Sequence, residues 1–165
     1  MTSTVQEFLK ANERYAASFQ KGNLPMPPAR KAVILTCMDA RLDPARFLGL
    51  EEGDAHVIRN AGGRATEDAI RSLVISEQLL GTTEVVVIHH VDCGMLTFSN
   101  EDLRGKLKQD FGTSADHIDF LPFKDLAQSV RDDIATIKAS PFIPDSVTVS
   151  GYIYDVKSGK LLPVT

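Results

Sequence analysis

The sequence predicts an α/β fold, with a central, mostly parallel β-sheet flanked by helices and a C-terminal hairpin at one edge. Residues 32–36 and 84–88 are short apolar runs that contain β-branched side chains, which is typical of strands buried on both faces. Stretches with helical periodicity alternate with these runs. This alternation indicates a parallel sheet, because parallel neighbours need a long crossover that is usually a helix.

The first expected element is a helix over about residues 4–20. Thr4-x-x-Glu7 resembles a capping box, and the apolar residues that follow recur on one helical face. We expect Gly22 to end this helix. The proline-rich segment 25–28 then forms a stiff connector rather than a domain linker, because too little chain precedes it to form a domain.

The middle of the chain contributes one further strand and two helices. Residues 55–59 are a short strand candidate. Thr66 is expected to cap a helix over about 67–80, with two acidic residues in its first turn, where the helix dipole favours them. A polar helix is expected over about 101–110.

The C-terminal part predicts a helix followed by a hairpin. Apolar residues over 123–137 have the spacing of an amphipathic helix. Residues 146–156 then form a strand, and 160–164 form a short returning strand after a turn. Pro163 in the last strand suits an edge position, where its missing N–H leaves no neighbour unpaired.

Length and composition indicate one domain, residues 1–165. The chain is 43% hydrophobic and 24% charged, which are ordinary globular proportions. Its net charge of -4 argues against nucleic acid and anionic membrane partners, since both need a basic patch. No apolar run approaches the roughly 20 residues that span a bilayer, and the polar N-terminus does not resemble a signal peptide. We therefore expect a cytoplasmic location.

Three motifs contain the residues suited to metal binding and proton transfer. They are Cys37-Met38-Asp39-Ala40-Arg41, Arg59-Asn60-Ala61-Gly62-Gly63 and His90-Val91-Asp92-Cys93-Gly94. The first and third begin where buried strands end, and ligands gather at the carboxyl ends of strands in open α/β sheets. The fold is therefore expected to bring Cys37, His90 and Cys93 together.

Two thiolates and one imidazole suit Zn²⁺, and three protein ligands leave its fourth position for water, as in catalytic sites. The chain has only two cysteines, which excludes both a four-cysteine structural zinc site and a disulfide-dense scaffold. His89 and His90 point to opposite faces of an extended strand, and we favour His90 because it lies nearer the strand end. We expect one Zn²⁺ per chain, held by Cys37, His90 and Cys93.

Asp39 and Arg41 are expected to form a functional pair beside this site. A carboxylate two residues from a zinc ligand can accept a proton from zinc-bound water or occupy the fourth position itself, and Arg41 would hold it off the metal and ionised. The alternative is an ordinary surface ion pair. Asn60, Ala61 and Gly62 are candidates for the substrate pocket, because glycine permits close backbone approach. Alternatively, they only form the turn before the next helix.

Other classes of function remain open at this point. Zinc held for structure alone would give a binding protein without turnover. A reversible Cys37–Cys93 disulfide would give a thiol-redox protein instead. A nucleotide-binding protein is disfavoured, because the sequence has neither a P-loop nor the G-x-G-x-x-G fingerprint.

The three motifs together resemble the signature of β-class carbonic anhydrases, over the chain from about residue 30 to the C-terminal hairpin. This resemblance implies that Cys37, His90 and Cys93 bind zinc and that Asp39 and Arg41 form the family's Asp–Arg dyad. It also implies a homodimer whose N-terminal helix packs on the partner subunit, with homotetramers in many members and active sites near the dimer interface.

The third motif, extended to His-His-Val-Asp-Cys-Gly-Met, is similar to a small subgroup that includes both carbonic anhydrases and carbonyl sulfide hydrolases. The resemblance implies attack of zinc-bound hydroxide on a small linear gas. The expected reaction is the reversible hydration of carbon dioxide to bicarbonate. The alternative is hydrolysis of carbonyl sulfide to hydrogen sulfide and carbon dioxide at the same site.

Overall fold

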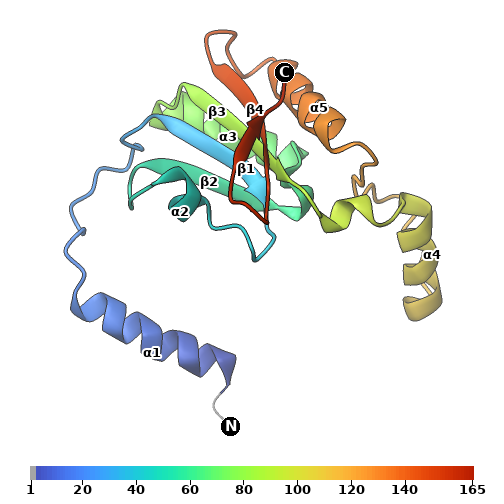
Figure 1. Cartoon of the computed structure of the whole chain (residues 1–165), viewed down its shortest axis with the longest axis horizontal. Coiled ribbons are helices and arrows are strands. Elements are labelled where there is room, and N and C mark those ends of the chain that lie inside the picture. Colours follow the sequence, from blue (N-terminus) through green and yellow to red (C-terminus); the bar gives the residue numbers. More distant parts are fainter. Residues whose placement is uncertain (1–2) are drawn as a thin grey trace.

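The computed structural model describes residues 3–165 and confirms the α/β fold, with a five-stranded sheet at its centre (Figure 1). The strands are β1 (Ala32–Cys37), β2 (Ala55–Asn60), β3 (Glu84–His90), β4 (Thr148–Tyr154) and β5 (Leu161–Pro163). Their order is β2-β1-β3-β4-β5, and the first four run parallel. β5 runs antiparallel to β4, which confirms the predicted hairpin at the sheet edge.

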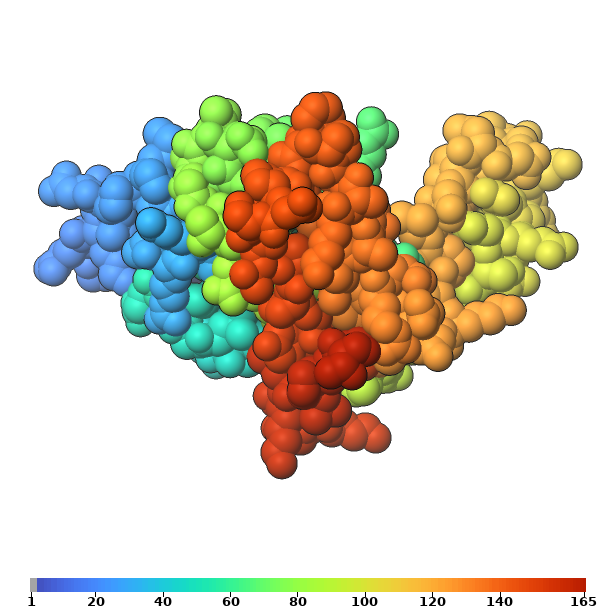
Figure 2. All heavy atoms as spheres, turned by 90° about the horizontal axis from the view of Figure 1, so that it is seen from above, coloured from blue at the N-terminus to red at the C-terminus, as the bar shows by residue number. Residues whose placement is uncertain are grey.

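The helices differ in how they relate to the sheet. They are α1 (Thr4–Ala17), α2 (Pro44–Leu48), α3 (Glu67–Leu80), α4 (Asn100–Phe111) and α5 (Leu126–Lys138). α3 has the predicted extent, the Thr66 cap and the acidic first turn. α1 and α4 bury none of their residues, and Figure 2 shows them at opposite ends of the molecule. No helix within residues 3–165 is long and apolar enough to cross a membrane.

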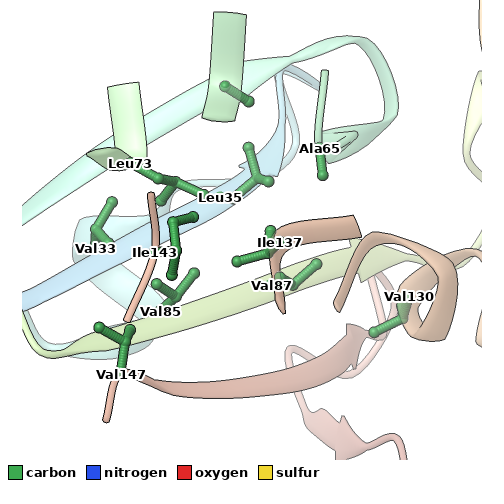
Figure 3. Packing of buried hydrophobic residues seen from close by; sticks show 11 residues of the cluster. Val33, Leu35, Ala65, Leu73, Val85, Val87, Val130, Ile137, Ile143 and Val147 are labelled. Carbon is green, nitrogen blue, oxygen red and sulfur yellow. The ribbon is translucent and has the colours of Figure 1, made fainter. Parts of the chain in front are cut away.

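The hydrophobic core lies between the sheet and the two helices α3 and α5. Figure 3 shows Leu73 of α3 and Ile137 of α5 in the same cluster as Leu35 of β1 and Val87 of β3. Each of these side chains is fully buried, which contributes about 1.5–3 kcal/mol per side chain. This packing fixes β1 and β3 side by side, with Thr36 next to Ile88 in the parallel register. The two strands consequently end within one residue of each other in the register.

The N-terminal helix is shorter than predicted and has a different cap. The Ser3 side chain accepts a hydrogen bond from the Gln6 N–H, and the Gln6 side chain accepts one from the Ser3 N–H. The capping box predicted one residue later is therefore wrong. α1 ends at Ala17, so its predicted extension to residue 20 and its termination at Gly22 are also wrong. None of the residues of α1 is buried, so no packing against the rest of the chain stabilises a longer helix.

Other boundaries differ from the sequence prediction for local reasons. α5 begins at Leu126 instead of residue 123, because the Asp125 side chain caps it by accepting a backbone N–H. β3 continues through His90, two residues beyond its predicted end, because β4 pairs with it as far as Tyr154. β4 and β5 are each shorter than predicted, and α2 is a short helix that the sequence analysis does not identify.

α3 buries one carboxyl group without a partner. Glu77 is 8% exposed, and neither of its carboxylate oxygens has a hydrogen-bond partner among the described residues. Burial raises the pKa of Glu77 to about 7, because removal from water disfavours the charged form.

Replacing Glu77 should stabilise the protein at neutral and alkaline pH but not below about pH 4.5. Its folded-state pKa lies above the ordinary 4.5, so the native protein loses stability as pH rises from about 4.5 to about 7. Glu77→Gln should therefore match the parent below about pH 4.5 and exceed its free energy of unfolding by about 1–3 kcal/mol at about pH 8. Urea unfolding at both pH values measures this difference. The exposed Glu84→Gln is the control, and a Glu77→Gln effect that is independent of pH would contradict the assignment.

Candidate metal centre

The carboxyl ends of β1 and β3 bring two cysteines and one histidine together. Cys37 is the last residue of β1, His90 is the last residue of β3, and Cys93 lies in the loop that follows. One ligand atom from each of the three lies within 4.8 Å of the other two, and all three residues are buried. The structure therefore places these candidates as the strand-end argument predicts.

The orientation of His90 leaves one ring nitrogen free for a ligand. Its Nδ1 lies 2.9 Å from the Val91 carbonyl oxygen, which can only accept, so Nδ1 carries the proton. Nε2 is buried and has no hydrogen-bond partner among the described residues. An unpaired buried nitrogen is rare in folded proteins. A cation at this position would satisfy its lone pair, so this nitrogen fits a metal ligand.

The two cysteines also favour a cation. Hydrogen bonding between their sulfurs lowers the pKa of Cys37 and raises that of Cys93, because a second thiolate beside the first would be repelled. Both are free thiols rather than a disulfide. A divalent cation removes this conflict, since it stabilises both thiolates at once. Two sulfurs and one imidazole nitrogen make a donor set that suits Zn²⁺.

Arg41 holds Asp39 beside the cluster. Two guanidinium nitrogens, Nε and Nη2, donate to the two Asp39 oxygens at 3.0 and 2.8 Å. These bonds keep the pKa of Asp39 well below its ordinary value. Asp39 Oδ2 lies 3.7 Å from His90 Nε2, so an ionised carboxylate faces the space where a metal would bind. The Asp39–Arg41 pair expected from the sequence is present in the structure.

Asp92 is a further partner of Arg41 that the sequence analysis missed. Arg41 Nη1 donates to Asp92 Oδ2 at 2.7 Å, and Nη2 donates to the Asp92 carbonyl at 2.9 Å. Arg41 therefore connects the first motif to the third. Asp92 has φ +56°, in the left-handed region that Asp tolerates better than most residues. In the sequence, the only indication of this role is that Asp92 lies between the predicted ligands His90 and Cys93.

Arg59 also has a positioning role that the sequence analysis did not assign. Its Nε donates to the Cys37 carbonyl at 3.0 Å, and its Nη2 donates to the Asp39 carbonyl at 2.7 Å. Both acceptors are backbone carbonyls of the first motif, at the candidate ligand Cys37 and two residues after it. Arg59 therefore fixes the backbone of the first motif from the neighbouring strand β2.

An open pocket of about 340 Å³ adjoins the two cysteines. Its lining residues are Cys37, Met38, Asp39, Ala61, Gly62, Cys93, Gly94, Met95 and Phe98. Ala61 and Gly62 thus lie in the pocket wall. Asn60 does not: its side chain bonds to the Arg64 backbone, at 2.8 Å to the carbonyl and 2.7 Å to the N–H. Gly62 has φ +83°, and a Cβ there would lie 2.9 Å from Met95 Cγ, so this wall requires glycine.

Comparisons with known proteins agree with these motifs. Residues 32–161 match the family model for carbonic anhydrase. The chain is 45% identical to β-carbonic anhydrase 1 of Mycobacterium tuberculosis, covering 100% of this chain and 99% of that protein. It is 36% identical to carbon disulfide hydrolase of Saccharolobus solfataricus, over 95% and 87% of the two chains. The crystal structure of carbonic anhydrase from Streptococcus mutans has a TM-score of 0.96 at 51% identity, over 100% and 99%.

The donor set predicts that Cys93→Ser loses the metal. A serine hydroxyl stays protonated near neutral pH, so it cannot replace a thiolate as a zinc ligand. We expect about one zinc per chain in the parent and less than about a tenth of that in Cys93→Ser, measured by elemental analysis after dialysis. Met38→Leu, at the pocket rim, is the control and should keep its zinc. Full zinc content in Cys93→Ser would remove Cys93 from the ligand set.

Proposed function

The chain belongs to the carbonic anhydrase family, in its β class, and we propose that it catalyses the zinc-dependent, reversible hydration of carbon dioxide to bicarbonate. The observation that carries this proposal is the unpaired, buried Nε2 of His90 beside Cys37 and Cys93, two cysteines that line a pocket with largely apolar walls. The protein is an enzyme of this kind. Its two free thiols suit the cytoplasmic location that we propose for it.

Each residue of the proposed site has a distinct task. Cys37, His90 and Cys93 hold one Zn²⁺. Bound there, zinc would act as a Lewis acid and would lower the pKa of a water molecule in its fourth position toward neutral pH. Carbon dioxide is linear and uncharged, so apolar side chains such as Met95 and Phe98 suit it better than charged groups would.

Asp39 orients the attacking water. A carboxylate whose pKa lies well below its ordinary value remains ionised at neutral pH and is a weak base. It therefore accepts a hydrogen bond from water rather than storing a proton. Arg41 keeps Asp39 in this state, and Asp92 fixes the far side of the Arg41 guanidinium. The dyad therefore determines which oxygen lone pair faces the substrate.

Carbonyl sulfide is the second candidate substrate. Its hydrolysis needs the same nucleophile and the same three ligands. Two observations support it: methionine and phenylalanine side chains line the pocket, and a relative at 36% identity is named carbon disulfide hydrolase. Sulfur-containing linear molecules are larger and more polarizable than carbon dioxide, and methionine side chains pack well against them.

We further propose that α1 packs on a second copy of this chain, giving a homodimer or homotetramer. The apolar residues of α1 are exposed by 51–67%: Val5, Phe8, Leu9 and Tyr15. Among the described residues, Tyr15 in the last turn of α1 bonds to Glu52, and Lys21 in the segment that follows the helix bonds to Glu51. A contiguous exposed apolar face of this kind is typical of a protein–protein contact.

Side-by-side turnover with both gases tests the proposed substrate. With the zinc-loaded protein at about pH 8, we expect carbon dioxide hydration at least about tenfold faster than hydrogen sulfide release from carbonyl sulfide. Asp39→Asn should retain zinc and lose about a hundredfold in hydration rate, because a neutral amide is a weaker acceptor for the water than the carboxylate. Faster turnover of carbonyl sulfide would reverse the order of substrates. Bound zinc without turnover of either gas would indicate a structural site, and a Cys37–Cys93 disulfide without zinc would indicate a redox protein.

Charge placed on the apolar face of α1 should break the proposed assembly. Glutamate at an apolar interface must be desolvated without a partner, which is strongly unfavourable. The double substitution Phe8→Glu and Leu9→Glu should reduce the mass in sedimentation equilibrium to that of one 18.0 kDa chain. Lys10→Glu, on the polar face of the same helix, is the matched control and should leave the mass unchanged. An unchanged mass in the double variant would contradict packing through this face.

A further inference from the structure

A second group of buried polar residues lies behind the pocket wall, and the proposed reaction does not use it. His89, Ser129 and Asp133 are 0%, 1% and 3% exposed. His89 Nδ1 lies 2.7 Å from Ser129 Oγ, and His89 Nε2 lies 3.0 Å from Asp133 Oδ2. Arg64 Nε donates to the same Asp133 oxygen at 2.9 Å. We call these four residues the Asp133 cluster.

The Asp133 cluster has the residue types of a hydrolytic triad, but its geometry excludes that use. Ser129 Oγ is 2.7 Å from the Leu126 carbonyl oxygen, which accepts from it, and the serine itself is buried. No substrate can reach a hydroxyl that is 1% exposed without unfolding of α5. The cluster therefore acts on the protein itself.

Its hydrogen bonds lead to the pocket wall. His89 Nε2 faces two acceptors, Asp133 Oδ2 and the Gly63 carbonyl oxygen at 3.2 Å, so this nitrogen carries a proton and contacts both. Arg64 directly follows the short turn Ala61–Gly63 and is held by Asp133 and, at 2.9 Å, by the Leu121 carbonyl. Asp133 therefore acts on the end of the turn in two ways. It contacts His89, which contacts the Gly63 carbonyl, and it accepts from Arg64, the residue that follows the turn.

The Ala61–Gly63 turn packs so closely against β1 that it has little room to move. A Cβ at Gly63 would lie 2.9 Å from Cys37 N and from the carbonyl carbon of Thr36. Gly62 and Cys37 also line the same pocket. The turn that contacts the Asp133 cluster through Gly63 therefore also packs against the backbone of the candidate ligand Cys37 and forms part of the pocket wall. A small shift of the turn would therefore move the pocket wall and press on the backbone at Cys37 together.

A buried charged cluster is weak evidence of stabilisation, because apolar residues of the same volume often stabilise as well. Hydrogen bonds to fixed acceptors, however, restrict the orientation of the groups they join, which apolar contacts do not. We propose that His89, Arg64 and Asp133 are positioning residues, which set the Ala61–Gly63 turn against Cys37 and so fix the shape of the substrate pocket. This inference rests on the proposed metal site.

Cobalt-substituted protein tests this positioning role, because the absorption bands of cobalt–thiolate sites report ligand geometry without any substrate. The test variant is Asp133→Asn, which preserves shape and leaves the Arg64 guanidinium without its anionic partner. The matched control is Val130→Ala, on the same helix α5, fully buried and without a polar contact to the turn. Thermal unfolding of both variants measures their general loss of stability.

We expect Asp133→Asn to keep one cobalt per chain, to shift the cobalt–thiolate bands, and to lower kcat/KM for carbon dioxide by about tenfold. Val130→Ala should unfold at lower temperature and retain both the spectrum and kcat/KM within about twofold. Ser129→Ala, which removes one contact of His89, should shift the bands in the same direction by less, and it replaces Asp133→Asn if that variant does not fold.

An unchanged spectrum and kcat/KM in Asp133→Asn would overturn the inference and leave the cluster a structural element. If the parent binds cobalt but converts neither gas, the proposed function fails, while the spectra still decide on positioning. If the parent binds no cobalt, the rate at which the two thiols react with a disulfide reagent decides instead. A rate altered in Asp133→Asn and not in Val130→Ala would support positioning, and equal rates would contradict it.

Discussion

The convergence of two cysteine sulfurs and one imidazole nitrogen is the constraint on which the rest of this structure depends. Without a cation the arrangement is electrostatically unfavourable, because the second sulfur resists ionisation and a buried ring nitrogen has no partner. A divalent ion resolves both problems at once. The folded chain therefore holds three donor atoms close together, although in the absence of a cation their proximity is unfavourable.

The sheet provides this spacing through register. β1 and β3 are adjacent and parallel, so Cys37 and His90 come to the same edge although they are far apart in sequence. Arginines then fix the loops that leave the strands: Arg59 holds the Cys37 loop, and Arg41 joins Asp39 to Asp92. The Asp133 cluster adds a contact from α5 on the opposite side of the glycine turn. The pocket is thus supported from the sheet, the loops and a helix.

The sequence alone predicted what depends on local pattern. The buried strands, α3 and the identity of the residues gathered at the strand ends follow from apolar runs, caps and the rule for parallel sheets. The cap of α1 lies one residue earlier than predicted, because Ser3-x-x-Gln6 and Thr4-x-x-Glu7 both fit a capping box and the sequence does not distinguish them. The contacts of Arg41 with Asp92 and of His89 with Ser129 are not predicted, since they join residues 51 and 40 positions apart and depend on packing.

X-ray absorption at the zinc edge of the isolated protein measures the central claim most directly. The account predicts one zinc with two sulfur neighbours near 2.3 Å and two nitrogen or oxygen neighbours near 2.0 Å, one of them an imidazole with its characteristic outer-shell scattering. A first shell without sulfur, or one with four sulfurs shared between chains, would contradict a site built from Cys37, His90 and Cys93.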